Sequence, residues 1–231
     1  MKRNQIIIVL GVAIVIAVGI IAYFSTRGTG GSLLAGVGGG GMEVEIKPTD
    51  LVHGSANAPV TIVEYASMTC PHCAAFATGT LPELKKEYID TGKVRLVFRE
   101  YPLDGAARLA SAAARCFEGE AALNFIDLLF RNQTGPQGWI QDFDGDKQMS
   151  QQDIEEGMAR MGRMAGMGRE QIIACTRDPA KLALVDANWN EGQTRYNVAS
   201  TPTFLINGNL HRGEISFASM KAEIDPLLAD K

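Results

Sequence analysis

In the body of the chain, the spacing of hydrophobic positions changes twice. Short apolar runs, bounded by glycine, proline or charged residues, predict three strands, at 42–47, 58–67 and 93–101. Apolar positions then recur every three or four residues over 104–195, which predicts a block of helices. The pattern returns to a hairpin over 201–212, turning at Asn207 and Gly208, and to a closing helix. Because strands lie on both sides of the helical block, we predict that the block is inserted into an α/β unit.

Capping residues predict where helices begin. Proline suits the first position of a helix, so a helix is expected to start at Pro71, with Cys70 as its N-cap. Pro82 lies inside the same helix and should kink it. Ser150, followed three residues later by Asp153, resembles a capping box at the start of another helix.

The N-terminal pattern predicts export. Lys2 and Arg3 precede an uncharged apolar run over residues 6–24, which as a helix would nearly span a bilayer core. Positive charges favour the cytoplasmic side, so we interpret residues 1–25 as a transmembrane anchor with the rest of the chain outside the cytoplasm. A cleaved signal peptide is the alternative, although no clean A-x-A site follows the run. Residues 26–42 are Gly-rich and are expected to form a flexible linker.

Composition narrows the classes of function. The chain has 231 residues, of which 46% are apolar and 21% charged, as is typical of a folded globular body. This length allows one domain with a large insertion, or two small domains. The formal net charge of -4 disfavours a nucleic-acid-binding surface, which would need a basic face.

The candidate chemistry lies in a Cys-Pro-His-Cys motif at residues 70–73, formed by two of the four cysteines. A zinc site would need four ligands, commonly from two such motifs, and the chain has one. A purely structural bridge would suit a loop, whereas this pair is predicted to open a helix after a strand. We therefore expect no metal and no cofactor, and we favour a redox-active dithiol.

The predicted position of the motif supplies a redox mechanism. At a helix N-terminus, Cys70 would face unpaired backbone N–H groups and the positive end of the helix dipole, which both favour its thiolate. Pro71 and His72 lie between the cysteines, and His72 would favour the thiolate further by donating a hydrogen bond or carrying charge. A stabilised thiolate makes the disulfide a good electron acceptor. We expect Cys70 to be the more exposed, attacking cysteine, and Cys73 to be buried and to resolve the mixed disulfide.

Two segments together carry a family resemblance. APVTIVEYASMTCPHC at 58–73 and STPTFLING at 200–208 resemble the DsbA-like family of thioredoxin-fold thiol–disulfide oxidoreductases. FREYPLD at 98–104, leading into an Ala-rich helix, is similar to the secreted and membrane-anchored branches of that family. The resemblance covers residues 43–231.

The resemblance implies a fold and a division into domains. The fold is an α/β thioredoxin fold with an inserted helical domain, here preceded by the transmembrane helix and the Gly-rich linker. The thioredoxin-like domain would comprise residues 43–103 plus 188–231, and the inserted domain would comprise residues 104–187.

The resemblance also implies roles for Thr201 and Pro202. Their peptide bond corresponds to the family's cis-proline loop, which packs against the active-site cysteines. A cis bond before proline costs little and exposes the preceding backbone, so Thr201 could pair with an extended substrate segment. An ordinary trans proline that starts a strand is the alternative.

Glu64 occupies the position of the family's buried acid, six residues before the first cysteine. Burial would raise its pKa and suit it to take or give the proton of Cys73. The alternative is a glutamate at the end of a strand that faces water. We expect Lys93 to pair with Glu64, with Arg95 or Arg99 as substitutes.

The remaining cysteines, Cys116 and Cys175, both lie in the predicted insertion, where some members of the family carry a second, non-catalytic disulfide. Such a bond would form in an oxidising compartment if the helices bring the two residues together. Two buried free thiols, acting as small apolar residues, are the alternative.

The function implied is the oxidation of newly exported, unfolded proteins that contain free cysteines. Electrons would then pass to a quinone-linked membrane reoxidase of the DsbB type. The enzyme would be anchored in the inner membrane and face the periplasm, or would be periplasmic if the N-terminal segment is cleaved. A disulfide isomerase or thiol reductase on the same scaffold is one alternative. A non-enzymatic binding or holdase protein is another.

Overall fold

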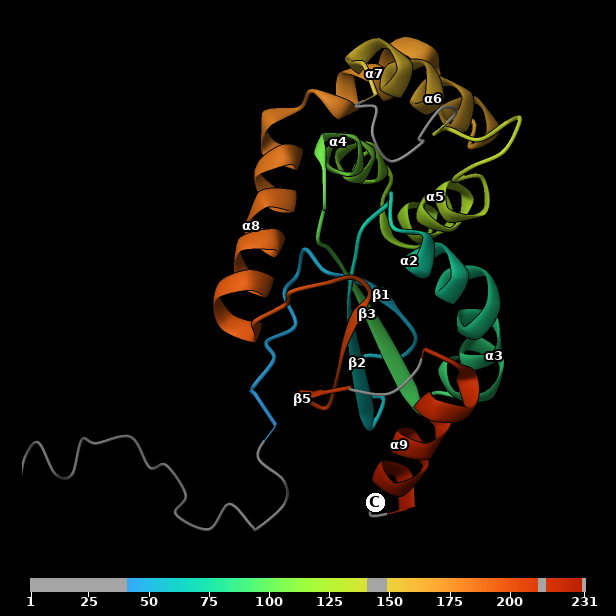
Figure 1. Cartoon of the computed structure of the whole chain (residues 1–231). Coiled ribbons are helices and arrows are strands. Elements are labelled where there is room, and N and C mark those ends of the chain that lie inside the picture. The colour runs from blue at the N-terminus through green and yellow to red at the C-terminus, as the bar shows by residue number, and fades with distance from the viewer. Residues whose placement is uncertain (1–40, 141–148, 212–214, 230–231) are drawn as a thin grey trace, which may run out of the picture. The chain divides into compact units, whose positions relative to one another are not determined.

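The computed structural model describes residues 41–140, 149–211 and 215–229, and its centre is a five-stranded sheet (Figure 1). The strands are β1 (Leu51–His53), β2 (Val60–Ala66), β3 (Val94–Glu100), β4 (Thr203–Ile206) and β5 (Asn209–Leu210). They follow the order β1-β3-β2-β4-β5. β2 and β3 are parallel, and the other neighbours are antiparallel. The strands predicted at 58–67 and 93–101 and the hairpin at 201–212 are confirmed.

The predicted anchor at residues 1–25 lies outside the described residues, as does nearly all of the linker predicted at 26–42. Among the residues that the structure describes, no helix has the length and apolar character needed to cross a bilayer.

The prediction of a strand at 42–47 is wrong, because the first strand of the described chain, β1, begins at Leu51. Val44 and Ile46 do pack against the apolar cluster on the sheet, as their alternation predicted. However, the segment forms no strand, and the carbonyls of Glu43 and Glu45 accept hydrogen bonds from side chains. The guanidinium of Arg99, for example, donates to the carbonyl of Glu45. A segment whose carbonyls are bound in this way covers the sheet without extending it.

One helical run joins β2 to β3. It consists of α2 (Pro71–Ala75), the π-helical turn η1 (Phe76–Thr80), α3 (Leu81–Leu84) and the π-helical turn η2 (Lys85–Ile89). The predicted start at Pro71 is confirmed. Pro82 lies in the first turn of α3, directly after η1, so the helix changes its geometry next to the proline.

Five helices lie between β3 and β4 in the described part of the chain. They are α4 (Gly105–Ala114), α5 (Gly119–Arg131), α6 (Gln151–Met164), α7 (Arg169–Thr176) and α8 (Pro179–Tyr196). α9 (Phe217–Ala229) follows β5. The inserted helical block is therefore confirmed, as is the capping box of Ser150 and Asp153 at the start of α6. The domain boundary predicted after residue 187 falls within α8.

The two faces of the sheet have different covers (Figure 1). Glu64 in β2 is opposite Phe98 in β3 and Phe204 in β4, so these three side chains share one face. Residues of η1, α3 and α9 pack on that face. On the other face, Tyr65 and its neighbours pack against Tyr196 of α8. Glu64 is consequently a carboxyl group placed within an apolar layer.

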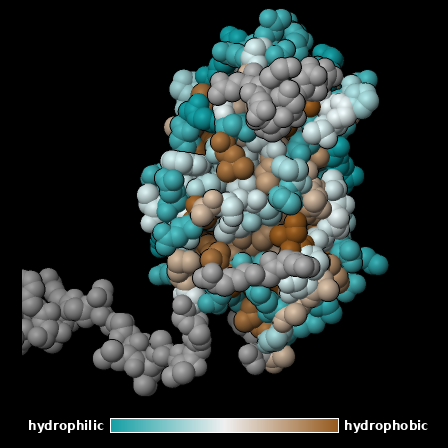
Figure 2. Space-filling model, in the orientation of Figure 1, coloured by the Kyte–Doolittle hydropathy of each residue, from teal (hydrophilic) through white to brown (hydrophobic). Residues whose placement is uncertain are grey.

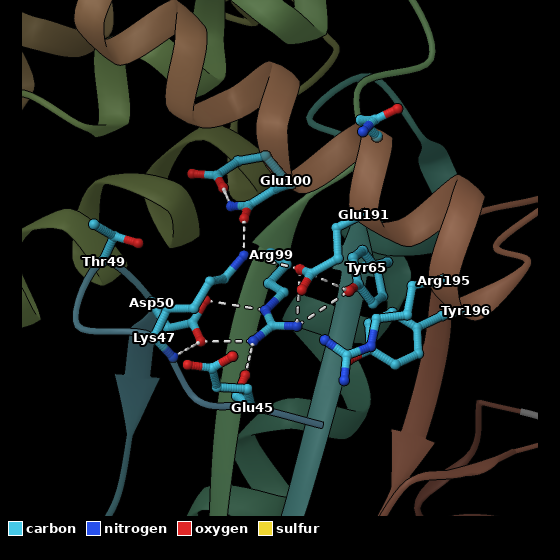
Figure 3. A network of polar contacts seen from close by, with 12 residues as sticks. Glu45, Lys47, Thr49, Asp50, Tyr65, Arg99, Glu100, Glu191, Arg195 and Tyr196 are labelled. Carbon is cyan, nitrogen blue, oxygen red and sulfur yellow. Dashed lines mark hydrogen bonds and ion pairs between the residues drawn. The ribbon is translucent and has the colours of Figure 1, made fainter. Parts of the chain in front are cut away.

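On the face of the sheet that carries Tyr65, the buried Arg99 forms a network of hydrogen bonds and ion pairs (Figure 3). Arg99 donates to Asp50 through Nε (3.0 Å) and Nη2 (2.8 Å), and both side chains are 0% exposed. Nη1 of Arg99 donates to Glu191 of α8 and to the hydroxyl of Tyr65, each at 3.2 Å. Lys47 Nζ also donates to Glu191 (2.8 Å). This network joins the segment before β1, strands β2 and β3, and α8.

Large apolar side chains are mostly covered. On the face shown in Figure 2, hydrophobic residues form separate patches among polar ones. The large hydrophobic residues that remain exposed in the described part of the chain are Met42, Leu103, Met164 and Leu184.

The hairpin of β4 and β5 turns as predicted at Asn207 and Gly208, which both have positive φ, of 46° and 81°. Gly208 is required for a second reason. Met42 N–H donates to the carbonyl of Gly208 (2.9 Å), and a Cβ at this glycine would collide with the carbonyl of Met42. The described chain therefore begins directly against the β4–β5 turn.

Candidate active site

The Cys-Pro-His-Cys motif lies where β2 leads into α2. The chain turns over residues 67–70 after β2 ends, and α2 begins at Pro71. Cys70 is the N-cap, with φ -75° and ψ 121°, and its carbonyl accepts the N–H of Ala74 (3.1 Å). Cys70 and Cys73 are not bonded to each other, so the structure represents the dithiol form.

Exposure differs within the motif. Cys70 is 5% exposed and Cys73 is 0% exposed, so their order agrees with expectation, although Cys70 is less accessible than its predicted attacking role suggested. Pro71 and His72 are both exposed. Among the described residues, we find no hydrogen bond or ion pair made by the imidazole of His72. This residue acts on Cys70 through its backbone N–H instead.

The surroundings of Cys70 favour its thiolate. The pKa of Cys70 is lowered to about 5, first because the thiol of Cys73 donates a hydrogen bond to it. Burial opposes this shift, whereas the Thr201 side chain and the backbone N–H groups of Cys73 and His72 support it. At neutral pH, Cys70 is therefore ionised.

Cys73 and Glu64 show the opposite behaviour. Burial, the hydrogen bond to Cys70 and the nearby charge of Glu64 raise the pKa of Cys73. Burial and then the charge of Cys70 raise the pKa of Glu64 to about 8. The Oε1 atom of Glu64 is buried without a hydrogen-bond partner in the described structure. Near neutral pH, both groups therefore hold their protons in the dithiol form.

The prediction that Glu64 pairs with a cation is wrong for Lys93, Arg95 and Arg99 alike. The ammonium of Lys93 lies 5.9 Å from the centre of the Tyr88 ring. Arg95 donates to the hydroxyl of Thr61 (2.7 Å), and Arg99 belongs to the network around Asp50. In β3, Phe98 lies opposite Glu64 and shares its face of the sheet. Arg95 and Arg99 are an odd number of residues from Phe98, so their side chains point to the other face and cannot reach Glu64.

Glu64 lines a cavity and forms no ion pair in the described structure. The volume of this cavity is about 110 Å³. Besides apolar side chains and Glu64, it is lined by His53 of β1, Lys85 of η2, and Asn124, Asp127 and Arg131 of α5. The pKa of His53 is lowered to about 4, mainly by burial and then by the charge of Lys85. Such a cavity is large enough to hold water beside the Glu64 carboxyl.

Thr201 and Pro202 face the cysteines from the segment before β4. Their peptide bond is cis. The Cys70 sulfur lies 3.2 Å from the carbonyl oxygen of Thr201, to which it donates when it is protonated. A second cavity, of about 330 Å³, lies beside Pro202 and is lined also by Ser200 and Thr203. The sequence had placed these residues near the dithiol only through the family resemblance.

Cys116 and Cys175 form a disulfide that links the turn after α4 to α7. Their Cα atoms are 5.9 Å apart, and 59 residues separate them in the sequence. This bond lies within the inserted helices, apart from Cys70 and Cys73, which remain free thiols.

The loop that carries Cys70 is tied to the inserted helices by residues that the sequence analysis did not identify. Asp104, the N-cap of α4, binds Ala107 N–H through Oδ1 (2.7 Å) and accepts from the Thr69 hydroxyl through Oδ2 (2.6 Å). Gln133, two residues after α5, donates to the carbonyls of Met68 (2.9 Å) and Cys70 (3.1 Å). Aspartate before an Ala-rich helix is a recognisable cap. Gln133 has no comparable signal in the sequence.

Replacing Glu64 by glutamine is expected to change how stability depends on pH. Because the folded pKa of about 8 lies above the ordinary value of 4.5, the unfolded chain releases this proton first, and wild-type stability falls as pH rises from about 4.5 to about 8. Glu64→Gln removes that loss. The free energy of unfolding of the variant, relative to that of wild type, should therefore increase by roughly 3 kcal/mol between pH 5 and pH 8. Urea titrations of the proteins with Cys70 and Cys73 in the dithiol form measure this difference.

The matched control for this prediction is Glu83→Gln, since Glu83 is exposed on α3. Its curve should run parallel to that of wild type. If the Glu64→Gln curve were also parallel, the Glu64 carboxyl would ionise in the folded protein as it does in the unfolded chain.

The chain as a whole is similar to known proteins. The family model described as thioredoxin matches residues 46–226. A putative protein-disulfide oxidoreductase of Rickettsia bellii is 30% identical over 188 residues, which cover 80% of this chain and 67% of that protein. A probable disulfide bond formation protein D of Bacillus cereus is 29% identical, with 97% of this chain and 98% of that protein covered.

Two solved structures show the same architecture. The alpha-DsbA1 of Wolbachia pipientis matches with a TM-score of 0.69 and 24% identity over 81% of this chain and 94% of that chain. BdbD of Bacillus subtilis matches with a TM-score of 0.65 and 21% identity over 78% of this chain and 94% of that chain. These likenesses support the thioredoxin fold with its helical insertion. The chain therefore belongs to the thioredoxin family and, within it, to the DsbA-like thiol–disulfide oxidoreductases.

Proposed function

We propose that this enzyme introduces disulfide bonds into exported proteins through Cys70 and Cys73. The observation that carries the proposal is the set of donors around the Cys70 sulfur, which lowers the pKa of this thiol to about 5. These donors stabilise the negative charge of the thiolate in the reduced form, whereas the disulfide has no such charge to stabilise. The pair therefore gains stability when it is reduced, which is the property of a disulfide donor.

The reaction begins with the Cys70–Cys73 disulfide. A substrate thiolate attacks the Cys70 sulfur, a mixed disulfide forms, and the bond to Cys73 breaks. Cys73 leaves as a thiolate and takes up a proton, which Glu64 can supply because its carboxyl group is protonated near neutral pH. A second thiolate of the substrate then attacks the substrate sulfur of the mixed disulfide. This step releases an oxidised substrate and the stabilised Cys70 thiolate.

Thr201 and Pro202 are proposed to bind the substrate beside the dithiol. The carbonyl of Thr201 already contacts the Cys70 sulfur, and the next residue, Pro202, lines the 330 Å³ cavity, which gives room for a substrate side chain. An extended segment of an unfolded protein could pair with the backbone at Thr201. The cavity beside Glu64 lets its carboxyl regain a proton from water.

Export and reoxidation follow from the same proposal. The apolar run at residues 6–24 supports an inner-membrane anchor, or a signal segment, with the enzyme on the periplasmic side. The disulfide of Cys116 and Cys175 supports an oxidising compartment. A dithiol formed there needs an electron acceptor, which we propose is a quinone-linked membrane reoxidase of the DsbB type.

A redox titration against glutathione tests the proposed direction of the reaction. The Cys70–Cys73 pair should equilibrate at a potential more positive than about -180 mV, well above that of a cytosolic thiol pool. A pair near about -270 mV would be kept reduced in a cell, and that result would assign the enzyme to the reductases or isomerases instead. Peptide mapping after alkylation confirms that the titrating pair is Cys70 and Cys73.

A further inference from the structure

Gln133 makes an unusual connection between the inserted helices and the active-site loop. Its side-chain nitrogen donates to the carbonyls of Met68 and Cys70, at 2.9 and 3.1 Å. A primary amide has two N–H groups, so one nitrogen can serve both carbonyls at once. The side chain is buried, with Gln133 5% exposed, and these bonds span 65 and 63 residues of sequence.

Gln133 is itself held firmly in place. Its N–H donates to the carbonyl of Phe130 (3.3 Å), and its own carbonyl accepts the N–H of Ile140 (3.0 Å). Next to it, the Trp139 N–H donates to the carbonyl of Asn132 (3.0 Å), and the buried Trp139 indole donates to the carbonyl of Leu129 (3.0 Å). The amide of Gln133 therefore starts from a fixed backbone and loses little freedom when it binds the loop.

The two carbonyls that Gln133 binds enclose Thr69 and Cys70 in the chain, since one belongs to Met68 and the other to Cys70. The carbonyl of Cys70 is also the first acceptor of α2, because it binds the N–H of Ala74. Fixing this carbonyl fixes ψ of Cys70, and with it the direction in which α2 begins. That direction decides whether the N–H groups of His72 and Cys73 point at the Cys70 sulfur.

We propose that Gln133 is a positioning residue for the dithiol, which holds the Cys70 carbonyl so that the Cys70 sulfur stays in front of its donors at the start of α2. Gln133 touches neither sulfur and acts only through the backbone. Through this side chain, the helical insertion contributes to the reduction potential of the Cys70–Cys73 pair. This role rests on the proposed function of the pair as a disulfide donor.

The test compares Gln133→Leu with Gln137→Leu. Leucine matches glutamine in size and removes the donors, and Gln137 is an exposed glutamine in the same loop. Absorbance of the reduced protein at the thiolate band, followed against pH, gives the midpoint for Cys70. Gln133→Leu should move this midpoint up by about one pH unit and lower the equilibrium constant for oxidation of glutathione about tenfold. Gln137→Leu should leave both quantities at their wild-type values.

Thermal unfolding separates positioning from a purely structural contribution. A folded Gln133→Leu protein that is less stable but titrates like wild type would overturn the proposal. If Gln133→Leu does not fold, Gln133→Asn decides, because its shorter amide keeps a donor at this buried position but cannot hold both carbonyls. It should shift the midpoint in the same direction, and an unchanged midpoint would overturn the proposal.

The two proposals fail in different ways. A wild-type potential near that of a reductase would remove the oxidase function, whatever Gln133 does. A strongly oxidising wild type with an unchanged Gln133→Leu variant would leave the function in place and reject the role of Gln133.

Discussion

Replacing Cys70 by serine is expected to reduce oxidation of a dithiol peptide to the uncatalysed rate. Cys70 carries the sulfur that the substrate attacks, and serine can form no disulfide with Cys73. The expected loss is complete, because Cys73 is 0% exposed and its raised pKa keeps it protonated. The rate at which a fluorescent peptide with two cysteines is oxidised, with excess oxidised glutathione present, measures this effect.

The double variant Cys116→Ser/Cys175→Ser is the matched control. It removes the other pair of cysteines, so it should retain activity at temperatures at which it is folded. It should lose about 2–4 kcal/mol of unfolding free energy, because the disulfide closes a long loop. If Cys70→Ser kept full activity in cells, the chain would act as a binding protein or holdase, and the dithiol would be incidental.

Replacing Arg99 by methionine is expected to have the largest effect on stability, a loss of roughly 3–5 kcal/mol in the free energy of unfolding. Arg99 and Asp50 form an ion pair in which both side chains are 0% exposed. Methionine fills much of the same volume but leaves the Asp50 carboxylate buried without its cation. Breaking a buried pair costs far more than breaking an exposed one. Urea denaturation of the oxidised proteins at neutral pH gives the difference.

Two further variants make this measurement decisive. Arg108→Met breaks the ion pair with Asp186, whose side chains are 38% and 50% exposed, and it should cost less than about 1 kcal/mol. The double variant Arg99→Met/Asp50→Leu removes both buried charges and should be more stable than Arg99→Met alone. Equal losses in Arg99→Met and Arg108→Met would mean that water reaches the network around Asp50.

Local sequence signals predicted many of the elements, because their causes are local. The turn at Asn207 and Gly208 needs residues that tolerate positive φ, and Pro71 suits the first turn of a helix. The strand predicted at 42–47 failed for a non-local reason. Alternation correctly placed Val44 and Ile46 against the sheet, but Arg99, far along the chain, binds the backbone that a strand would have used. Periodicity describes burial and does not report which group a carbonyl binds.

The site shows the same division. The motif located Cys70 and Cys73, and the family resemblance pointed to Glu64, Thr201 and Pro202. The partner assigned to Glu64 was wrong because neighbouring positions in a strand point to opposite faces, and the candidate arginines lie on the other one. Gln133 could not be found at all, because a glutamine in a loop is ordinary until the fold brings it to the Cys70 carbonyl.

The contact between Met42 and the β4–β5 turn fixes where the described chain begins on the sheet. Asn207 N–H donates to the carbonyl of Thr61 (2.8 Å), so this turn lies at the N-terminal end of β2, whereas Cys70 follows the C-terminal end. The two ends of β2 are about 20 Å apart. In Figure 1, β5 and α2 accordingly lie at opposite ends of the sheet. Met42 and the dithiol therefore lie at opposite ends of β2, so a bulky unfolded client could contact the cysteines from the end of the sheet that is remote from Met42.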